Sequence, residues 1–79
     1  MQPIRTLEVD ARGLACPMPL LQMRRALAGL QPGERVHVLA TDPGSWRDFH
    51  SFAELSGNRL LSARERGGEY EYLLEKAGV

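Results

Sequence analysis

The order of the hydrophobic patterns constrains the fold of this chain most, because the patterns switch between strand and helix periods within only 79 residues. In residues 5–10, Leu7 and Val9 alternate with polar neighbours, which predicts a half-buried strand. Residues 17–28 then predict an amphipathic helix, because apolar side chains recur there at helical spacing. The apolar positions that define this stripe are Leu20, Met23, Leu27 and Leu30.

The second half of the chain repeats the alternation and ends in a hairpin. The turn "LQPGE" precedes a β-branched strand over residues 35–41, which "DPGS" interrupts. A second helix is expected to follow, capped by Asp42 or Ser45 and stopped by Gly57. Its apolar stripe consists of Trp46, Phe49, Phe52 and Ala53. The segments "NRLLSARER" and "EYEYLLEK", joined by two glycines, predict a terminal β-hairpin.

The resulting βαβαββ order predicts an α+β fold. We expect a two-layer α/β sandwich, in which two helices cover one face of a mixed four-stranded sheet. Residues 1–79 are expected to form a single domain, because the sequence has no internal repeat, low-complexity segment or long linker. A domain of this size buries only about 60% of the surface that its unfolded chain exposes, so its core must be small.

Composition excludes several classes of function. Ten basic and ten acidic residues leave no net charge, which argues against a general nucleic-acid or membrane-surface binder. One cysteine and two scattered histidines, His37 and His50, cannot form an internal disulfide or assemble a zinc site from this chain alone. We therefore expect no metal and no cofactor. The N-terminus "MQPIRTLEVD" resembles neither a signal peptide nor a membrane span, so we expect a cytoplasmic protein.

The single cysteine, Cys16, lies at the predicted start of the first helix, in "GLACPMPLL". Proline is well tolerated at the first helical position, so Pro17 is predicted to begin the helix and Cys16 to be its N-cap residue. The positive end of the helix dipole at that position favours a thiolate, so we expect a lowered thiol pKa and a nucleophilic sulfur. The alternative is a small buried cysteine without chemistry, and the spacing alone does not decide between the two.

A wider pattern adds to this interpretation. The segments "LEVDARGLACPMPLLQMRRAL", "PGE" and "TDPGSWRDFHSFAELSGN", with the terminal hairpin, resemble the TusA/SirA family of sulfur-carrier proteins, whose signature is Cys-Pro-x-Pro at a helix start. The resemblance covers nearly the whole chain. It implies that Cys16 bears a persulfide sulfur, with Pro17 and Pro19 as its conformational frame. The other positions that match the family's motifs are Asp10, Arg12, Gly13, Asp42, Pro43 and Asp48.

The function implied by the resemblance is sulfur relay. Cys16 would accept sulfur from a cysteine desulfurase and pass it to an acceptor protein, by chemistry similar to thiol–disulfide exchange. The acceptor could belong to tRNA thiolation, to molybdenum-cofactor synthesis or to related sulfur metabolism. Such a carrier is an enzyme only in a loose sense, and a monomer suits it best. The alternative is a regulatory or RNA- or protein-binding module with a structural cysteine, although the zero net charge argues against RNA.

Two departures from the family pattern concern the choice of partner. Met18 stands where the tRNA-thiolation members carry an acid, and "DFHSF" replaces the usual "D-I-P-x-F". Neither departure touches Cys16. A helical wheel places Met18, Gln22 and Arg25 opposite the apolar stripe, and Arg24 lies beside them. We expect these four side chains to form a docking rim for protein partners, which acts mainly on encounter rate and specificity.

Overall fold

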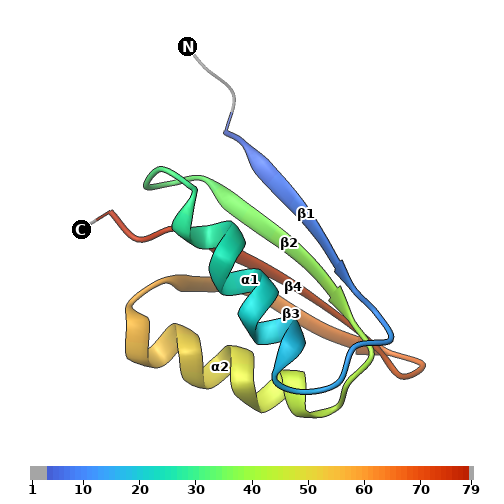
Figure 1. The fold of residues 1–79 in the computed structure, drawn as a ribbon. Helices are drawn as coiled ribbons and strands as arrows, with labels where there is room; N and C mark the ends of the chain where they lie inside the picture. Colours follow the sequence, from blue (N-terminus) through green and yellow to red (C-terminus); the bar gives the residue numbers. More distant parts are fainter. Residues whose placement is uncertain (1–3, 79) are drawn as a thin grey trace.

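The computed structural model describes residues 4–78 and confirms the predicted fold class. The outermost residues of the predicted domain, 1–3 and 79, lie outside this range. The elements are β1 (Thr6–Ala11), α1 (Met18–Ala28), β2 (Arg35–Ala40), α2 (Gly44–Ser56), β3 (Arg59–Arg66) and β4 (Glu69–Glu75). The strand order is β1-β2-β4-β3, and the sheet is mixed because only β1 and β2 run parallel. Both helices lie on the same face of the sheet (Figure 1).

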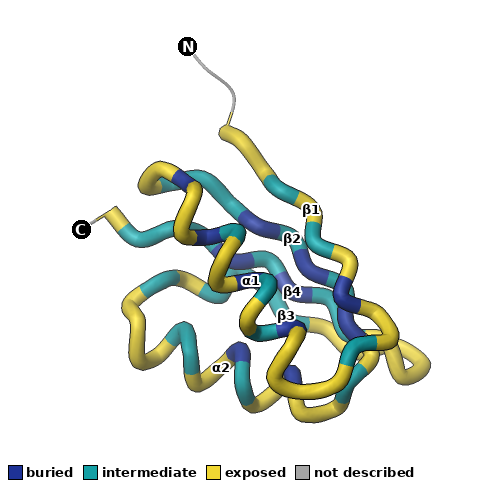
Figure 2. The backbone as a smooth tube through the Cα atoms, in the orientation of Figure 1, coloured by how far each residue is buried: buried dark blue, intermediate teal, exposed yellow. Residues whose placement is uncertain are grey.

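The core lies between this sheet face and the two helices (Figure 2). Helix α1 packs on β1 and β2 and buries Met23 and Leu27. Helix α2 buries Phe49, whose ring stacks on Tyr72 of β4 with 4.2 Å between the ring centroids. Trp46, which was expected in the same stripe, is 40% exposed. The buried apolar residues are Ala11, Met23, Leu27, Leu30, Val36, Val38, Ala40, Phe49, Tyr72 and Leu74.

The start of α2 differs from the prediction, because neither Asp42 nor Ser45 caps the helix with its side chain. Pro43 occupies the N-cap position and Ser45 lies inside the first turn. The Ser45 hydroxyl is buried and shares a hydrogen bond of 2.7 Å with the Tyr72 hydroxyl of β4. The sequence pattern suggested a cap because serine favours helix starts, but here a buried tyrosine provides the hydrogen-bond partner.

The predicted end of α2 is confirmed at Gly57. This residue has a φ of 81°, a left-handed conformation that glycine adopts without steric cost, and its N–H donates to the Ala53 carbonyl. The hairpin is confirmed as well, with Gly67 and Gly68 between the antiparallel strands β3 and β4. These features follow from local backbone preferences, which explains why the sequence predicts them well.

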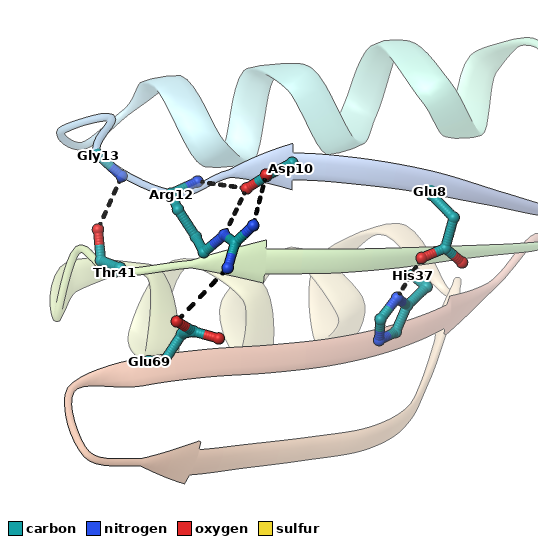
Figure 3. A network of polar contacts seen from close by, with 7 residues as sticks. All are labelled: Glu8, Asp10, Arg12, Gly13, His37, Thr41 and Glu69. Atoms are coloured by element: carbon teal, nitrogen blue, oxygen red, sulfur yellow. Dashed lines mark hydrogen bonds and ion pairs between the residues drawn. The ribbon is translucent and has the colours of Figure 1, made fainter.

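The outer face of the sheet carries a histidine held between two carboxylates. Because Val36 and Val38 face the core, His37 between them points to the other side. Its Nδ1 lies 2.7 Å from Oε1 of Glu8 on β1, as Figure 3 shows, and its Nε2 lies 2.6 Å from Oε2 of Glu71 on β4. Ionised carboxylates only accept hydrogen bonds, so both contacts are hydrogen bonds when both ring nitrogens carry a proton. The hydrogen bonds that the ring donates to Glu71 and, to a smaller extent, to Glu8 raise the pKa of His37.

We expect His37→Gln to lower the free energy of unfolding by about 1 kcal/mol near pH 5.5 and by less near pH 9. The effect is small because the ion pairs of His37 with Glu8 and Glu71 are partly exposed to solvent. The folded-state pKa of His37 lies above its usual 6.5, so its stabilisation is complete below that value and is lost as pH rises through the raised pKa. At acid pH the limit is set by Glu71, whose pKa is lowered from its usual 4.5. The stabilisation that Glu71 contributes is therefore complete above pH 4.5 and is lost as the pH falls through the lowered pKa of this carboxyl group.

Urea denaturation of the wild type and the His37→Gln variant across this pH range measures the effect. His50→Gln is the matched control. Within residues 4–78, the His50 ring forms a hydrogen bond only with the backbone carbonyl of Trp46 and none with a carboxylate. A stability difference that stays constant from about pH 5.5 to about pH 9 would contradict a charged histidine between the two carboxylates.

Candidate functional site

Cys16 lies in the loop between β1 and α1, and it is not the N-cap residue of α1. The helix begins at Met18, with Pro17 as its N-cap residue. The Pro17 carbonyl accepts a hydrogen bond of 3.1 Å from the N–H of Leu21, so helical bonding starts one residue later than predicted. Pro19 lies in the first turn and is buried, whereas Cys16 is exposed. The thiol is thus accessible, but it does not cap α1.

The thiol lies instead beside the first turns of α2. The Cys16 sulfhydryl donates a hydrogen bond to Oδ2 of Asp48, with 3.1 Å between the two atoms. A Cβ atom added to Gly44, the first residue of α2, would lie 3.9 Å from the Cys16 sulfur. The same position would lie 2.9 Å from Oδ2 of Asp42. The chain therefore brings a thiol and two carboxylates together around the start of α2.

Asp42 and Asp48 shift the pKa of the thiol in the opposite direction from the one that the sequence suggested. The hydrogen bond to Asp48 raises the pKa of the Cys16 thiol, and desolvation and the negative charges of Asp48 and Asp42 raise it further. The positive charge of Arg47 opposes them and lowers it. The expectation of a lowered thiol pKa is therefore wrong. That expectation rests only on the positive N-terminal end of α1, whereas the two carboxylates come from α2 and from the loop before α2.

The residues before Cys16 shape its loop through hydrogen bonds and ion pairs. The Arg12 guanidinium binds both carboxylate oxygens of Asp10, at 2.9 Å each, and lowers the pKa of Asp10 to about 2. The same guanidinium lies 3.7 Å from Glu69 at the start of β4 (Figure 3). The N–H of Gly13, whose φ is 82°, donates to the Thr41 hydroxyl at 2.9 Å. The sequence pattern does not predict this role of Thr41, because the hydrogen bond joins residues 28 positions apart.

The predicted docking residues lie in different environments along α1. Met18 is 39% exposed, Gln22 is partly buried, and Arg24 and Arg25 are exposed. The Arg24 guanidinium lies 5.8 Å from the centre of the Phe52 ring. It lines a groove between the two helices, whose other lining residues are Leu20, Asp48, Ser51, Phe52, Leu55 and Ser56. Because Asp48 lines this groove and also binds the thiol, Arg24 and Cys16 border the same surface.

Between residues 4 and 78, no three histidine, cysteine, aspartate or glutamate side chains are grouped so that they could hold a metal ion. Neither α1 nor α2 is long and apolar enough to span a membrane.

Comparison with known proteins identifies the family. The family model described as sulfurtransferase TusA matches residues 7–76. The sulfur carrier protein TusA of Allochromatium vinosum is 44% identical over 70 residues, which cover 89% of this chain and 92% of that protein. A putative sulfur carrier protein of Neisseria meningitidis is 40% identical over 67 residues, which cover 85% of this chain and 90% of that protein. The crystal structure of a SirA-like protein from Desulfitobacterium hafniense has a TM-score of 0.79 at 29% identity and covers 90% of this chain and 97% of its own. The chain therefore belongs to the TusA/SirA family of sulfur-carrier proteins.

Proposed function

We propose that this protein carries sulfur as a persulfide on Cys16, which it accepts from a cysteine desulfurase and delivers to an acceptor protein. The observation that carries the proposal is the exposed thiol of the only cysteine, held between α1 and α2 in a chain of this family. Pro17 and Pro19 follow it at the start of α1, and the contacts of Asp10, Arg12 and Gly13 hold the loop that presents it.

The transfer conserves atoms and oxidation state. The Cys16 sulfur bonds to the outer sulfur of the donor persulfide while the sulfur–sulfur bond of the donor breaks. The donor cysteine leaves as a thiolate and takes up a proton, and Cys16 becomes a persulfide. The same exchange with an acceptor thiol then regenerates Cys16. This chain needs no second cysteine for either step.

The acceptor belongs to tRNA thiolation, molybdenum-cofactor synthesis or a related sulfur pathway, and the reaction takes place in the cytoplasm. Met18 bears on this choice because its exposed side chain lies two residues from Cys16. An apolar group there favours acceptors with an apolar contact surface over those that recognise an acid.

Intact mass spectrometry tests the proposal. The purified protein is incubated with an active cysteine desulfurase and free cysteine, and its mass is measured before and after treatment with a thiol reductant. We expect a gain of one sulfur atom that the reductant removes, and no gain without the desulfurase. No gain with a desulfurase that is active on a control acceptor would contradict the proposal and favour a binding module with a structural cysteine.

We expect Arg24→Glu to slow sulfur acceptance from the desulfurase by about tenfold at low salt, because reversing a charge on a docking surface slows encounter. Arg24 lines the groove that contains Asp48, so a partner that reaches the thiol passes close to it. Time-resolved intact mass measures sulfur uptake, and alkylation by iodoacetamide measures the thiol itself.

Arg5→Glu is the matched control for this variant, because Arg5 is exposed just before β1, at the opposite end of that strand from the Cys16 loop. Arg25→Glu tests whether the neighbouring arginine shares the effect. Equal slowing of uptake and of alkylation by Arg24→Glu would mean that Arg24 tunes the thiol. Equal effects of the Arg5 and Arg24 variants would point to overall charge instead of docking.

A further inference from the structure

The hydrogen bond between Cys16 and Asp48 restricts the form that the sulfur can take. An ionised carboxylate has no proton to donate, so the 3.1 Å contact requires that the sulfur carries its proton. A thiolate at the same position would place two negative charges in contact, and the contact would break. The geometry of the free protein therefore corresponds to a thiol, which is a much weaker nucleophile than a thiolate.

A second carboxylate, that of Asp42, also disfavours a negative charge on the Cys16 sulfur. Oδ2 of Asp42 is buried and has no hydrogen-bond partner within the described residues. It lies beside Gly44, on the side of the α2 start where the thiol also lies. Arg47 is the cation whose charge acts in the opposite direction. The surroundings of Cys16 are therefore unfavourable to a negative charge on sulfur, although the residue itself is exposed.

We propose that Asp48 is a positioning residue that keeps Cys16 as a weakly reactive thiol in the free carrier, and that a bound sulfur donor releases it by engaging Asp48. This inference rests on the proposed function. The group on the donor that matches an ionised aspartate is a lysine or arginine side chain, which forms a charge-assisted hydrogen bond with it. Once Asp48 is paired with that cation, the thiol loses its hydrogen-bond acceptor and the negative charge beside it is compensated.

The released sulfur then follows the exchange already described. Cys16 gives up its proton and bonds to the outer sulfur of the donor, and the departing donor thiolate takes up a proton, so the step has no net oxidation. In the loaded carrier the Cys16 sulfur is bonded to a second sulfur and has no proton to donate to Asp48. The device therefore acts on the empty carrier, where it protects the thiol from small electrophiles and oxidants.

Alkylation by iodoacetamide as a function of pH tests the restraint on the thiol. We expect the wild-type midpoint to lie above the free-cysteine value of about 8.5. Asp48→Asn should lower the midpoint and speed alkylation near pH 7.5 by about tenfold or more, because the amide bears no charge and can donate to a thiolate. Asp48→Ser is a second variant, and circular dichroism checks that both fold. Glu54→Gln is the matched control, an exposed carboxylate near the end of α2.

Sulfur uptake from the desulfurase tests the release. If a bound donor engages Asp48, removing the carboxylate should accelerate alkylation much more than uptake, so the ratio of uptake to alkylation rates should fall about tenfold. Equal acceleration of both would overturn the release step, because the restraint would then persist in the complex. Unchanged alkylation in both Asp48 variants would overturn the restraint. A wild type that accepts no sulfur would refute the proposed function, whereas the alkylation profile would still decide the role of Asp48.

Discussion

Cys16→Ser is expected to abolish sulfur acceptance and leave the fold intact. A hydroxyl cannot form a persulfide, and no other cysteine in the chain can replace the lost thiol. The side chain is exposed and donates a hydrogen bond to Asp48, to which a serine hydroxyl can also donate. The free energy of unfolding should therefore change by no more than about 0.5 kcal/mol.

Two measurements check this result side by side. Intact mass after incubation with the desulfurase and cysteine should show no added sulfur on the variant, under conditions in which the wild type gains it. Urea denaturation should give closely similar midpoints for the two proteins. Sulfur uptake by the variant would place the persulfide on another group. A markedly lower midpoint would mean that the cysteine serves the core.

Phe49→Ala is expected to destabilise the protein by about 3–5 kcal/mol, which is the usual cost of removing a buried aromatic ring. The Phe49 side chain is fully buried and stacks on Tyr72, so it joins α2 to the centre of the sheet. A chain of this length has a total stability of only about 4–12 kcal/mol. The variant should therefore be largely unfolded at moderate temperature or in low urea.

Thermal and urea denaturation followed by circular dichroism measure this loss. Leu55→Ala is the matched control, because Leu55 lies on the same helix and is 87% exposed. It should change the free energy of unfolding by no more than about 0.5 kcal/mol. Similar stabilities of the two variants would show that α2 is not anchored through Phe49. Sulfur acceptance by Phe49→Ala should fall together with the folded fraction, since α2 supplies one wall of the site.

The fold is predictable from the sequence because its signals are local. Alternation of Leu7 and Val9 with polar residues marks β1, and a stripe with helical spacing marks α1. Gly57 ends α2 through its own backbone conformation. The errors concern helix starts, where side chains have competing partners. Ser45 bonds Tyr72 instead of capping α2, and that tyrosine is 27 positions away along the chain.

The sequence by itself determines the order of the elements, the α+β class and the position of the only thiol in a family motif, because each depends on neighbouring residues. Only the tertiary structure decides the ionisation of that thiol. The Cys16 sulfur reaches Asp48, 32 positions later, because the β1–α1 loop and the start of α2 meet above the sheet. A pKa responds to groups within a few ångströms in space, whatever their separation along the chain. The same reason explains why the pairing of His37 with Glu8 and Glu71 emerges only when three strands lie side by side.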